Sequence, residues 1–537
     1  MILPPRPENH PRPEPPRPAL DLPAELDKHP FRNRPELDRF APPPWNRLSP
    51  QWLEIEDTLP ADHLARAIDE AVDQLDPTDL FASSRGVGSK AHRPDLILKI
   101  VLYEIQMGRH SPAQWVQDVR DRRCLQWLGW GIKPSRTRFY AFHDRVGPFL
   151  ETLNRQVLRS AVMQGMTTAR RGSLDGTLIA ANASRHRLVN LSRLERRLAE
   201  LDRVIATDKT GQNAGAIPAW MARSPATRRR QRYRFGAARR KLLKQHAENA
   251  RRSRDRRQEP EKIVISTSDF EAALGRDKEK VFRPLYNLQV VQDLESPLIL
   301  GYEVFAQATD AGTMMPMRQR VRDLTGVSLE RILADAGYAS ALDLFDCVEA
   351  GLDLYAPYQE NDQTERRRSK QPQRQIPKSE FVWLAGEQTY QCPQGHRLTR
   401  IGQETRERAE GRTLELTTYR CAKEHCQKCP LAGRCTGSAK GRTIKRNEHE
   451  DLIVKHQAKM QTPEAKAIYR QRGQTVELRF ADAKTSRGLR RFSGRGLEHV
   501  QIEVGLWVLS HNLLVVQAAR QRKAAEGQNG TSCQDAA

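Results

Sequence analysis

The chain has little cysteine for its length and lacks a long apolar run. Cysteine occupies eight of 537 positions, which is too sparse for a protein stabilised mainly by disulfide bonds. No uninterrupted apolar stretch approaches the roughly 20 residues that a membrane-spanning helix needs, and the mean hydropathy is −0.71. Met1 to Leu3 run directly into prolines and charges, so the apolar segment of a secretory signal is missing. We therefore expect a cytoplasmic protein that uses no membrane.

Acidic residues are outnumbered by basic ones. The chain has 89 Lys and Arg residues against 66 Asp and Glu, a net charge of +23, and a pI of about 9.9. Fifteen of the basic residues fall within 223–257, where there are only two acids. A helical face with that charge would repel itself, so we expect a polyanion nearby, and double-stranded DNA is the partner we favour. The residues of this segment that we expect to bind DNA are Arg228, Arg229 and Arg230.

Residue patterns divide the chain into regions of different character. Residues 1–50 contain 15 of the 33 prolines, a density that no helix or sheet tolerates. Apolar periodicity then predicts helices, and from 171 onward it predicts strands that alternate with helices, which is an α/β pattern. The predicted regions are a disordered arm at 1–50, a helical domain at 51–168, an α/β core at 171–358 with a basic helical insertion at 185–280, a basic loop and cysteine-rich insertion at 360–460, C-terminal helices of the core at 461–520, and a disordered tail at 521–537.

The helical region 51–168 has two interpretations. Its last predicted helix follows Pro134 and Ser135 and combines an apolar face with several basic residues. That combination is typical of the helix-turn-helix domains that bind DNA. A small helical bundle that only packs against the core would show the same pattern, and periodicity does not decide between the two.

Three acidic residues stand where metal chemistry would need them. Asp175 and Asp335 each end an apolar, strand-like run, and open α/β sheets bind ligands at the carboxyl ends of their strands. Glu477 lies on a helix predicted over 464–484 and shares a face with Lys484, two helical turns later. Taken singly, each acid is more often a turn or capping residue. Together they are suited to hold a pair of divalent cations for phosphoryl transfer.

Three sequence blocks resemble the catalytic blocks of bacterial DDE insertion-sequence transposases. They are Leu174-Asp175-Gly176-Thr177, then Leu333-Ala334-Asp335-Ala336-Gly337-Tyr338, then Tyr469 and Arg472 followed by Glu477 and Lys484. The resemblance covers about 55–520. Four residues separate Arg472 from Glu477, whereas three is the commonest spacing in that family. The family implies an RNase H-like mixed sheet with flanking helices.

The resemblance also implies an activity, cofactors and partners. Such an enzyme cleaves the ends of its element and transfers the strands to target DNA, using two Mg²⁺ or Mn²⁺ ions held by Asp175, Asp335 and Glu477. It would act as a homodimer or higher oligomer on DNA, in the bacterial cytoplasm and associated with the nucleoid. The residues expected to contact DNA near the carboxylates are Tyr469, Arg472, Lys484, Arg490 and Arg491. The alternative is a decayed or domesticated copy that binds DNA without cutting it.

Five of the eight cysteines fall within 44 residues, which indicates a metal site in a reducing compartment. The candidates are Cys392, Cys421, Cys426, Cys429 and Cys435, with His396 and His425 among them. A Cys-x-x-Cys pair with further cysteines at a distance is typical of structural zinc, which takes four ligands. Seven candidates exceed four, and we choose Cys392, Cys426, Cys429 and Cys435, which leaves Cys421 as the spare. Thiols gathered by chance in a loop are the alternative.

Overall fold

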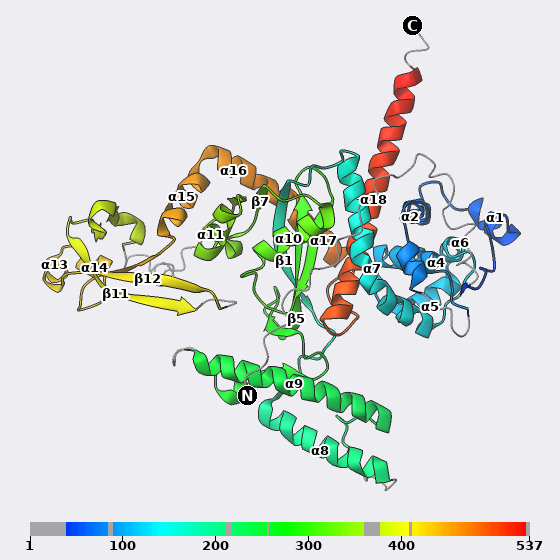
Figure 1. Ribbon diagram of the computed structural model, residues 1–537, viewed down its shortest axis with the longest axis horizontal. Coiled ribbons are helices and arrows are strands. Elements are labelled where there is room, and N and C mark those ends of the chain that lie inside the picture. Colours follow the sequence, from blue (N-terminus) through cyan, green and yellow to red (C-terminus); the bar gives the residue numbers. More distant parts are fainter. Residues whose placement is uncertain are drawn as a thin grey trace.

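The computed structural model describes residues 39–83, 90–210, 217–252, 254, 257–358, 376–407 and 411–532. Most of the predicted proline-rich arm, and the basic loop that follows 360, lie outside these residues. Within them the protein combines helices with mixed sheets, which confirms the α/β class. Figure 1 shows a central sheet with the N-terminal helices on one side, a second small sheet on the other, and a helical hairpin below.

The central sheet has six strands and mixes parallel with antiparallel pairs. Its strands are β1 (Arg171–Ala180), β4 (Ala273–Arg276), β5 (Phe282–Asp293), β6 (Ile299–Phe305), β7 (Arg331–Leu333) and β8 (Asp353–Tyr355). The order is β4-β5-β1-β7-β8, and β6 also pairs with β5. β5 is antiparallel to β1, β4 and β6, whereas β1, β7 and β8 run parallel. Every residue of β5 from 284 to 293 is buried, so this strand lies at the centre of the core.

The register between β1 and β7 places Asp175 beside the end of β7. The prediction that Asp175 ends its own strand is wrong, because β1 continues to Ala180. Ser173 of β1 pairs with Leu333 of β7. Asp175 and Asp335 therefore each lie two residues beyond the same paired position. Adjacent parallel strands bring residues at matched positions close together, here at the carboxyl end of β7. The topology thus joins two acids that are 160 residues apart in the sequence.

The helices that pack against the sheet include α10 (Met314–Thr325), α17 (Val476–Thr485) and α18 (Leu497–Ser532). α18 contacts β6 as well as the N-terminal helices, and residues 502–510 are all buried. Contrary to the expectation from sequence, α18 is long and apolar enough to cross a membrane by length and composition alone. However, 67% of its most apolar window is buried inside the protein. Packing in the core therefore accounts for its apolar character.

Two boundaries predicted near the C-terminus are wrong. The tail predicted to be disordered from 521 instead continues α18 to Ser532. The helix predicted over 464–484 is divided into α16 (Pro463–Arg470), a 3-10 turn η8 (Gln471–Gln474) and α17. The division occurs at Thr475, whose φ of −116° and ψ of −103° lie outside the helical region. The extra residue between Arg472 and Glu477 therefore falls in a break between two helices.

Seven helices lie in the described part of the N-terminal region. They are α1 (Pro50–Glu56), α2 (Leu64–Asp73), α3 (Thr78–Ala82), α4 (Pro94–Gln106), α5 (Pro112–Asp121), α6 (Arg123–Leu128) and α7 (Arg136–Met163). α4 is buried along its whole length, and α7 packs against α10 and α18. The predicted arm is structured where it is described, because Phe40 is 4% exposed and pairs with Ala91.

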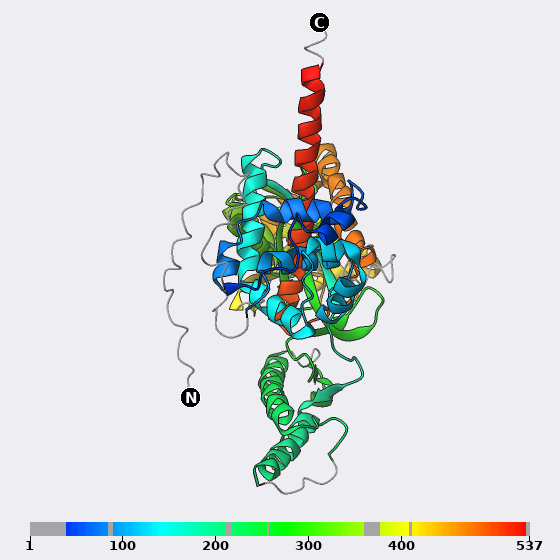
Figure 2. The same ribbon diagram turned by 90° about the vertical axis from the view of Figure 1, so that its right-hand side faces the viewer.

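Two insertions extend from the central sheet. The first contains α8 (Leu191–Thr210) and α9 (Pro225–Arg251), joined near their base by β2 (Leu188–Asn190) and β3 (Val264–Ser266). These elements bury an apolar cluster of their own, and Figure 2 shows them projecting away from the rest of the protein. The second insertion contains a five-stranded sheet with a separate core. Its elements are β9 (Val382–Leu384), β10 (Thr389–Gln391), β11 (Arg397–Glu407), β12 (Thr413–Cys421), β13 (Thr443–Asn447), α13 (Lys423–Lys428) and α14 (Ala432–Cys435).

Candidate active site

Three acids converge around the middle of β1. The Asp175 side chain is 15% exposed, and the Gly176 amide donates to its Oδ1 at 2.9 Å. Asp335 follows β7, and its Oδ1 accepts from the Gly337 amide at 2.7 Å. Glu477 lies in the first turn of α17, which packs against β1 and β5. A strand, a turn after a strand and a helix terminus therefore supply one carboxylate each.

A single guanidinium group links two of these carboxylates. Nη2 of Arg472 lies 3.2 Å from Oδ2 of Asp175, and Nη1 lies 2.7 Å from Oε1 of Glu477. Only 11% of the Arg472 side chain is exposed, whereas 53% of Glu477 is. A cationic group thus lies between two of the predicted metal ligands. The carboxylates are close enough to share one positive charge, and their oxygens are the ligands that hard divalent cations prefer.

The same charged groups influence one another's pKa values. The pKa of Asp175 is raised to about 6, mainly by burial and also by the Asp335 carboxylate, while the Arg472 guanidinium opposes the shift. Burial also raises the pKa of Tyr469, which lies within electrostatic reach of Arg472 and all three carboxylates. Tyr469 and Arg472 therefore lie beside the acids, although they belong to α16 and η8 rather than to the helix of Glu477.

Three basic residues predicted to bind DNA lie along the second half of β1. Nζ of Lys484 donates to Oγ1 of Thr177 at 2.5 Å, and burial lowers the pKa of this lysine. Arg490 is exposed, and its Nε donates to the carbonyl oxygen of Lys484 at 3.1 Å. Arg491 is exposed and forms a bridge with Ala180 at the end of β1. The structure therefore brings all three onto the strand that carries Asp175.

Arg228 does not have a side chain available to DNA. It is 4% exposed and is ion-paired with Asp208 of α8, to whose Oδ2 its Nε donates at 2.7 Å. It also donates to two backbone carbonyl groups. The prediction for Arg228 is wrong because its charge is used inside the protein. Its guanidinium pairs with Asp208 and so holds α9 against α8. Arg229 and Arg230 are exposed, and their contact with DNA stays a prediction.

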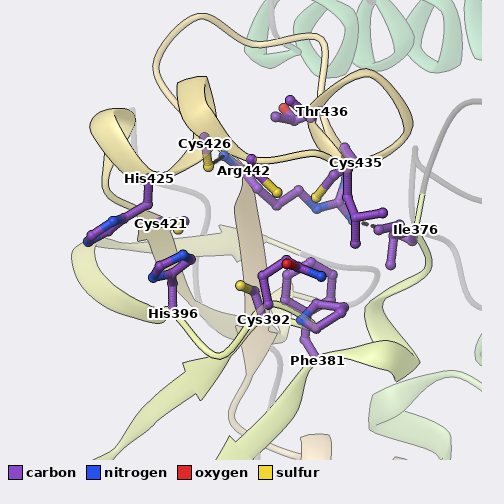
Figure 3. A pocket seen from close by; sticks show the side chains of 15 residues that line it. Ile376, Phe381, Cys392, His396, Cys421, His425, Cys426, Cys435, Thr436 and Arg442 are labelled. Carbon is purple, nitrogen blue, oxygen red and sulfur yellow. Dashed lines mark hydrogen bonds between the residues drawn. The ribbon is translucent and has the colours of Figure 1, made fainter.

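The clustered cysteines line one pocket, shown in Figure 3. Its lining includes Cys392, Cys421, Cys426, Cys429 and Cys435, together with His396 and His425. All five cysteines are free thiols. The Arg442 amide donates to Sγ of Cys426 at 3.5 Å, and the rings of the two histidines stack with their centroids 4.2 Å apart. Residues from both ends of the insertion therefore face one another.

Burial raises the pKa of Cys421 to about 12 and that of Cys435 to about 11, and neighbouring thiols add to both shifts. Cys421 interacts with Cys392, Cys426 and Cys435, so the predicted spare lies with the four chosen ligands. Over the described ranges, however, no group of three or more His, Cys, Asp or Glu side chains is arranged to hold a metal ion. That finding covers the thiols and the carboxylates alike, and both metal sites stay predictions.

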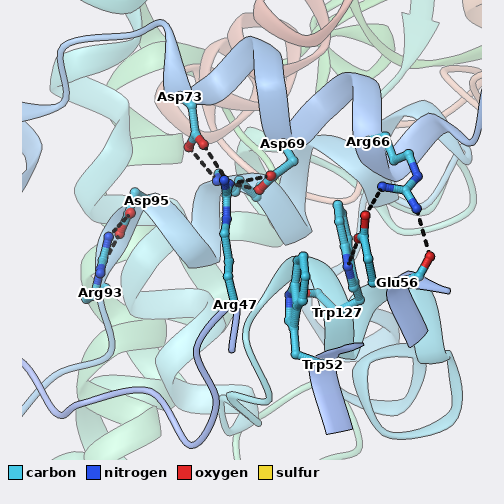
Figure 4. Close-up of polar contacts among 10 residues, drawn as sticks. Arg47, Trp52, Glu56, Arg66, Asp69, Asp73, Arg93, Asp95 and Trp127 are labelled. Atoms are coloured by element: carbon cyan, nitrogen blue, oxygen red, sulfur yellow. Dashed lines mark hydrogen bonds and ion pairs between the residues drawn. The ribbon is translucent and has the colours of Figure 1, made fainter. Parts of the chain in front are cut away.

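The N-terminal helices contain a buried charge network, drawn in Figure 4. Lys99 is 1% exposed, and its Nζ lies 2.5 Å from Oδ1 of Asp69 and 2.5 Å from Oδ1 of Asp73. Nη2 of Arg47 lies 2.7 Å and 3.0 Å from the remaining oxygens of the same two carboxylates. Two cations thus balance two anions, and these four side chains stabilise the packing of the N-terminal helices. DNA binding by this region stays a prediction.

A fourth acid, Asp310, lies beside the cluster although no sequence block marks it. It occupies the turn between β6 and α10. Its Oδ1 accepts from Nδ2 of Asn287 at 2.9 Å and from Nε2 of Gln289 at 2.7 Å. Both amides are buried in β5, at 1% and 0% exposure. Amides inside an apolar strand are the sequence signal that could have indicated a polar site here, because buried polar groups need partners.

Comparison with known proteins bears on the C-terminal half of the chain. Residues 391–516 match the family model described as a transposase DDE domain. The matched segment contains Glu477, Lys484 and the cysteine pocket, and it begins after Asp175 and Asp335. No curated protein matches the chain.

Proposed function

Taking the chain as a member of a DDE transposase family, we propose that it cleaves the ends of an insertion element and joins the freed strands to target DNA. The family match supports a transposase. The proposal is carried by the convergence of Asp175, Asp335 and Glu477, which are spread over 302 residues of sequence. A protein that only bound DNA would have no use for three carboxylates gathered around the same arginine and strand, since they repel phosphate.

We place the catalytic core in the RNase H-like class. The strand order β6-β5-β1-β7-β8, in which antiparallel pairs give way to parallel ones at β1, supports this class. The position of the acids also supports it, since Asp175 lies on the central strand and Asp335 directly follows its parallel neighbour.

The cofactor we propose is a pair of Mg²⁺ or Mn²⁺ ions held by Asp175, Asp335 and Glu477. Such ions would activate the attacking water or 3′-hydroxyl and stabilise the leaving oxygen. Arg472 holds two of these carboxylates, Asp175 and Glu477, in this structure, so its guanidinium would exchange them for a DNA phosphate when the cofactor binds. Glu477 is half exposed, which leaves its side chain room to turn toward an ion.

DNA would approach the carboxylates along the basic residues on β1 and the arm formed by α8 and α9. The side chains proposed to meet phosphate are Tyr469, Arg472, Lys484, Arg490 and Arg491 near the site, and Arg229 and Arg230 on the arm. Their positive potential offsets the repulsion between phosphate and the catalytic acids. Action as a homodimer or higher oligomer on DNA, in the bacterial cytoplasm, belongs to the same proposal.

For the cysteine pocket we propose one structural zinc ion bound by Cys392, Cys426, Cys429 and Cys435. The amide that donates to the Cys426 sulfur supports this, because such N–H groups orient and stabilise a ligating thiolate. Burial raises the pKa of Cys435, and the neighbouring thiols add to the shift. A cation would oppose that shift by favouring the thiolate form.

The test of the proposed function is cleavage of a DNA that carries the element's ends. The full chain should nick this DNA in the presence of Mg²⁺ and leave a scrambled end sequence largely uncut. Binding should persist when Mg²⁺ is replaced by a chelator. Specific binding without nicking, in either Mg²⁺ or Mn²⁺, would favour the decayed or domesticated copy instead.

Metal binding should weaken in mildly acidic solution. The pKa of Asp175 is raised to about 6, so the carboxyl group is protonated below that pH and a proton competes with the cation. Above about pH 7 the group is ionised and affinity for Mn²⁺ should reach a plateau. Each pH unit below about 6 should lower the affinity up to about tenfold. A Mn²⁺ titration repeated from about pH 5 to 8 measures this, and a flat profile would contradict it.

The chain purified without chelators should contain about one zinc ion, as measured by elemental analysis. Replacing Cys426 with Ser should remove most of it, because Cys426 is one of the proposed ligands and its sulfur accepts from the Arg442 amide. Cys124→Ser is the matched control, since Cys124 is a free thiol of the N-terminal helices. Wild-type protein that lacks zinc after growth with added zinc would rule out the site.

A further inference from the structure

Asp310 lies in a turn, yet its carboxylate accepts hydrogen bonds from the buried interior of the sheet. Its Oδ1 is fixed by two buried amides, Asn287 and Gln289. The amide of Gln289 is fixed in turn, because the Tyr338 hydroxyl donates to its Oε1 at 2.5 Å. Tyr338 is 1% exposed and follows Asp335 by three residues. One chain of hydrogen bonds therefore connects Asp310 to the segment that carries Asp335.

The glycine beside Asp175 lets the Asp310 carboxylate approach closely. A Cβ on Gly176 would overlap the Asp310 carboxylate and the Gln289 amide. A Cβ on Gly337 would lie 2.9 Å from Oδ1 of Asp335 and 3.9 Å from Oδ2 of Asp310, the latter an ordinary van der Waals distance. Asp310 therefore lies against the backbone at Gly176 and also near the segment that carries Asp335.

The charge of Asp310 is not matched by a basic side chain. Its Oδ1 takes both amide hydrogen bonds, and no ion pair to either oxygen is formed among the described residues. Asp175, in contrast, has Arg472 as its partner. A divalent cation bound beside Asp310 would supply the positive charge that this carboxylate lacks.

We propose that Asp310 is a fourth carboxylate of the divalent-cation site, with Oδ1 as its anchor and Oδ2 as the oxygen offered to the cation. The inference rests on the proposed function. The two amides hold the side chain in one orientation, and the free oxygen faces Gly337 beside Asp335. Asp310 would thus complete an oxygen-rich set to which β1, the segment after β7 and the turn after β6 each contribute.

The test is Mn²⁺ binding by the full chain, followed by electron paramagnetic resonance of the free ion. Asp310→Asn keeps an oxygen for the two amides and removes the charge of Oδ2. It should lower Mn²⁺ affinity about 10- to 100-fold. Asp310→Glu keeps the charge and should bind more tightly than Asp310→Asn. Asp293→Asn is the matched control, because Asp293 is a buried carboxylate of β5 that accepts from the Ser296 hydroxyl at 2.7 Å.

The outcomes separate the inference from the function on which it rests. Wild-type affinity in Asp310→Asn, with affinity lost in Asp335→Asn, would overturn the role of Asp310 and leave the metal site intact. Wild-type protein that binds no Mn²⁺ would overturn both. Equal losses in Asp310→Asn and Asp293→Asn would show a general effect on the fold and contradict the inference. The midpoint of thermal unfolding, measured in the presence of a chelator, verifies that each variant is folded.

Discussion

Replacing Asp175 with Asn should abolish DNA cleavage and leave DNA binding nearly unchanged. The substitution keeps the shape of the side chain and an oxygen that can accept from the Gly176 amide. It removes the charge that a cation needs, and a bound metal ion contributes several kcal/mol to a phosphoryl-transfer transition state. Cleavage should therefore fall by about 10³-fold or more. Affinity for the element's ends in chelator should stay within about threefold, since the phosphate contacts come from basic residues.

The matched control for this variant is Asp353→Asn. Asp353 is also a sheet carboxylate paired with an arginine, with Arg331 Nε 3.1 Å from its Oδ2. It lies at the start of β8, whereas Asp175 and Asp335 lie beyond the residues that pair β1 with β7. The control should cleave DNA at near the wild-type rate. If Asp175→Asn loses binding and cleavage together, Asp175 supports the fold and the protein is better described as a DNA binder.

Removing the charges of Arg229 and Arg230 together should weaken binding to DNA of any sequence. Both residues are exposed on α9, where nothing in the described structure buries them. Each phosphate contact releases about one counterion, so the slope of log affinity against log salt should become shallower by about 1.8. The same relation gives a loss of about tenfold or more near 0.2 M salt and a larger loss at lower salt. Fluorescence anisotropy over a range of salt concentrations measures both quantities.

Arg228→Ala is the contrasting variant on the same helix. Arg228 is buried against Asp208, so its loss leaves a carboxylate without its partner between α8 and α9. We expect the arm to open and limited proteolysis within it to become several-fold faster, while the salt slope changes less than in the double variant. An unchanged slope in the Arg229 and Arg230 variant would show that the arm does not bind the backbone of DNA.

The meeting of Asp175 and Asp335 could be predicted only in part. Apolar runs locate strands, and neighbouring parallel strands bring residues at matched positions together. Asp335 follows the end of β7 as expected, whereas β1 continues to Ala180, so Asp175 meets Asp335 from within its strand through the register of Ser173 with Leu333. Glu477 could be placed on a helix for similar reasons, since local periodicity fixes which residues share a face.

Other features depend on contacts that local patterns do not contain. The burial of Arg228 depends on Asp208, which is 20 residues away on another helix. The break at Thr475 follows Gly473, whose low helix propensity weakens the helix locally but does not determine where it divides. Asp310 is recognisable only from side chains on a different strand, because its own surroundings in sequence are those of an ordinary turn.

The position of α18 at the end of the chain determines when the protein can complete its packing during translation. This helix packs against α2, α4, α7 and β6, and the Gln106 side chain donates to the Ser510 hydroxyl at 2.6 Å. The ribosome makes α4 almost 400 residues before α18, which takes about 20 to 80 s at roughly 5–20 residues per second. During that time the apolar faces that α18 will cover have no partner from this chain. The N-terminal helices and the central sheet therefore reach their final packing only late in translation, and the nascent chain needs protection from aggregation until then.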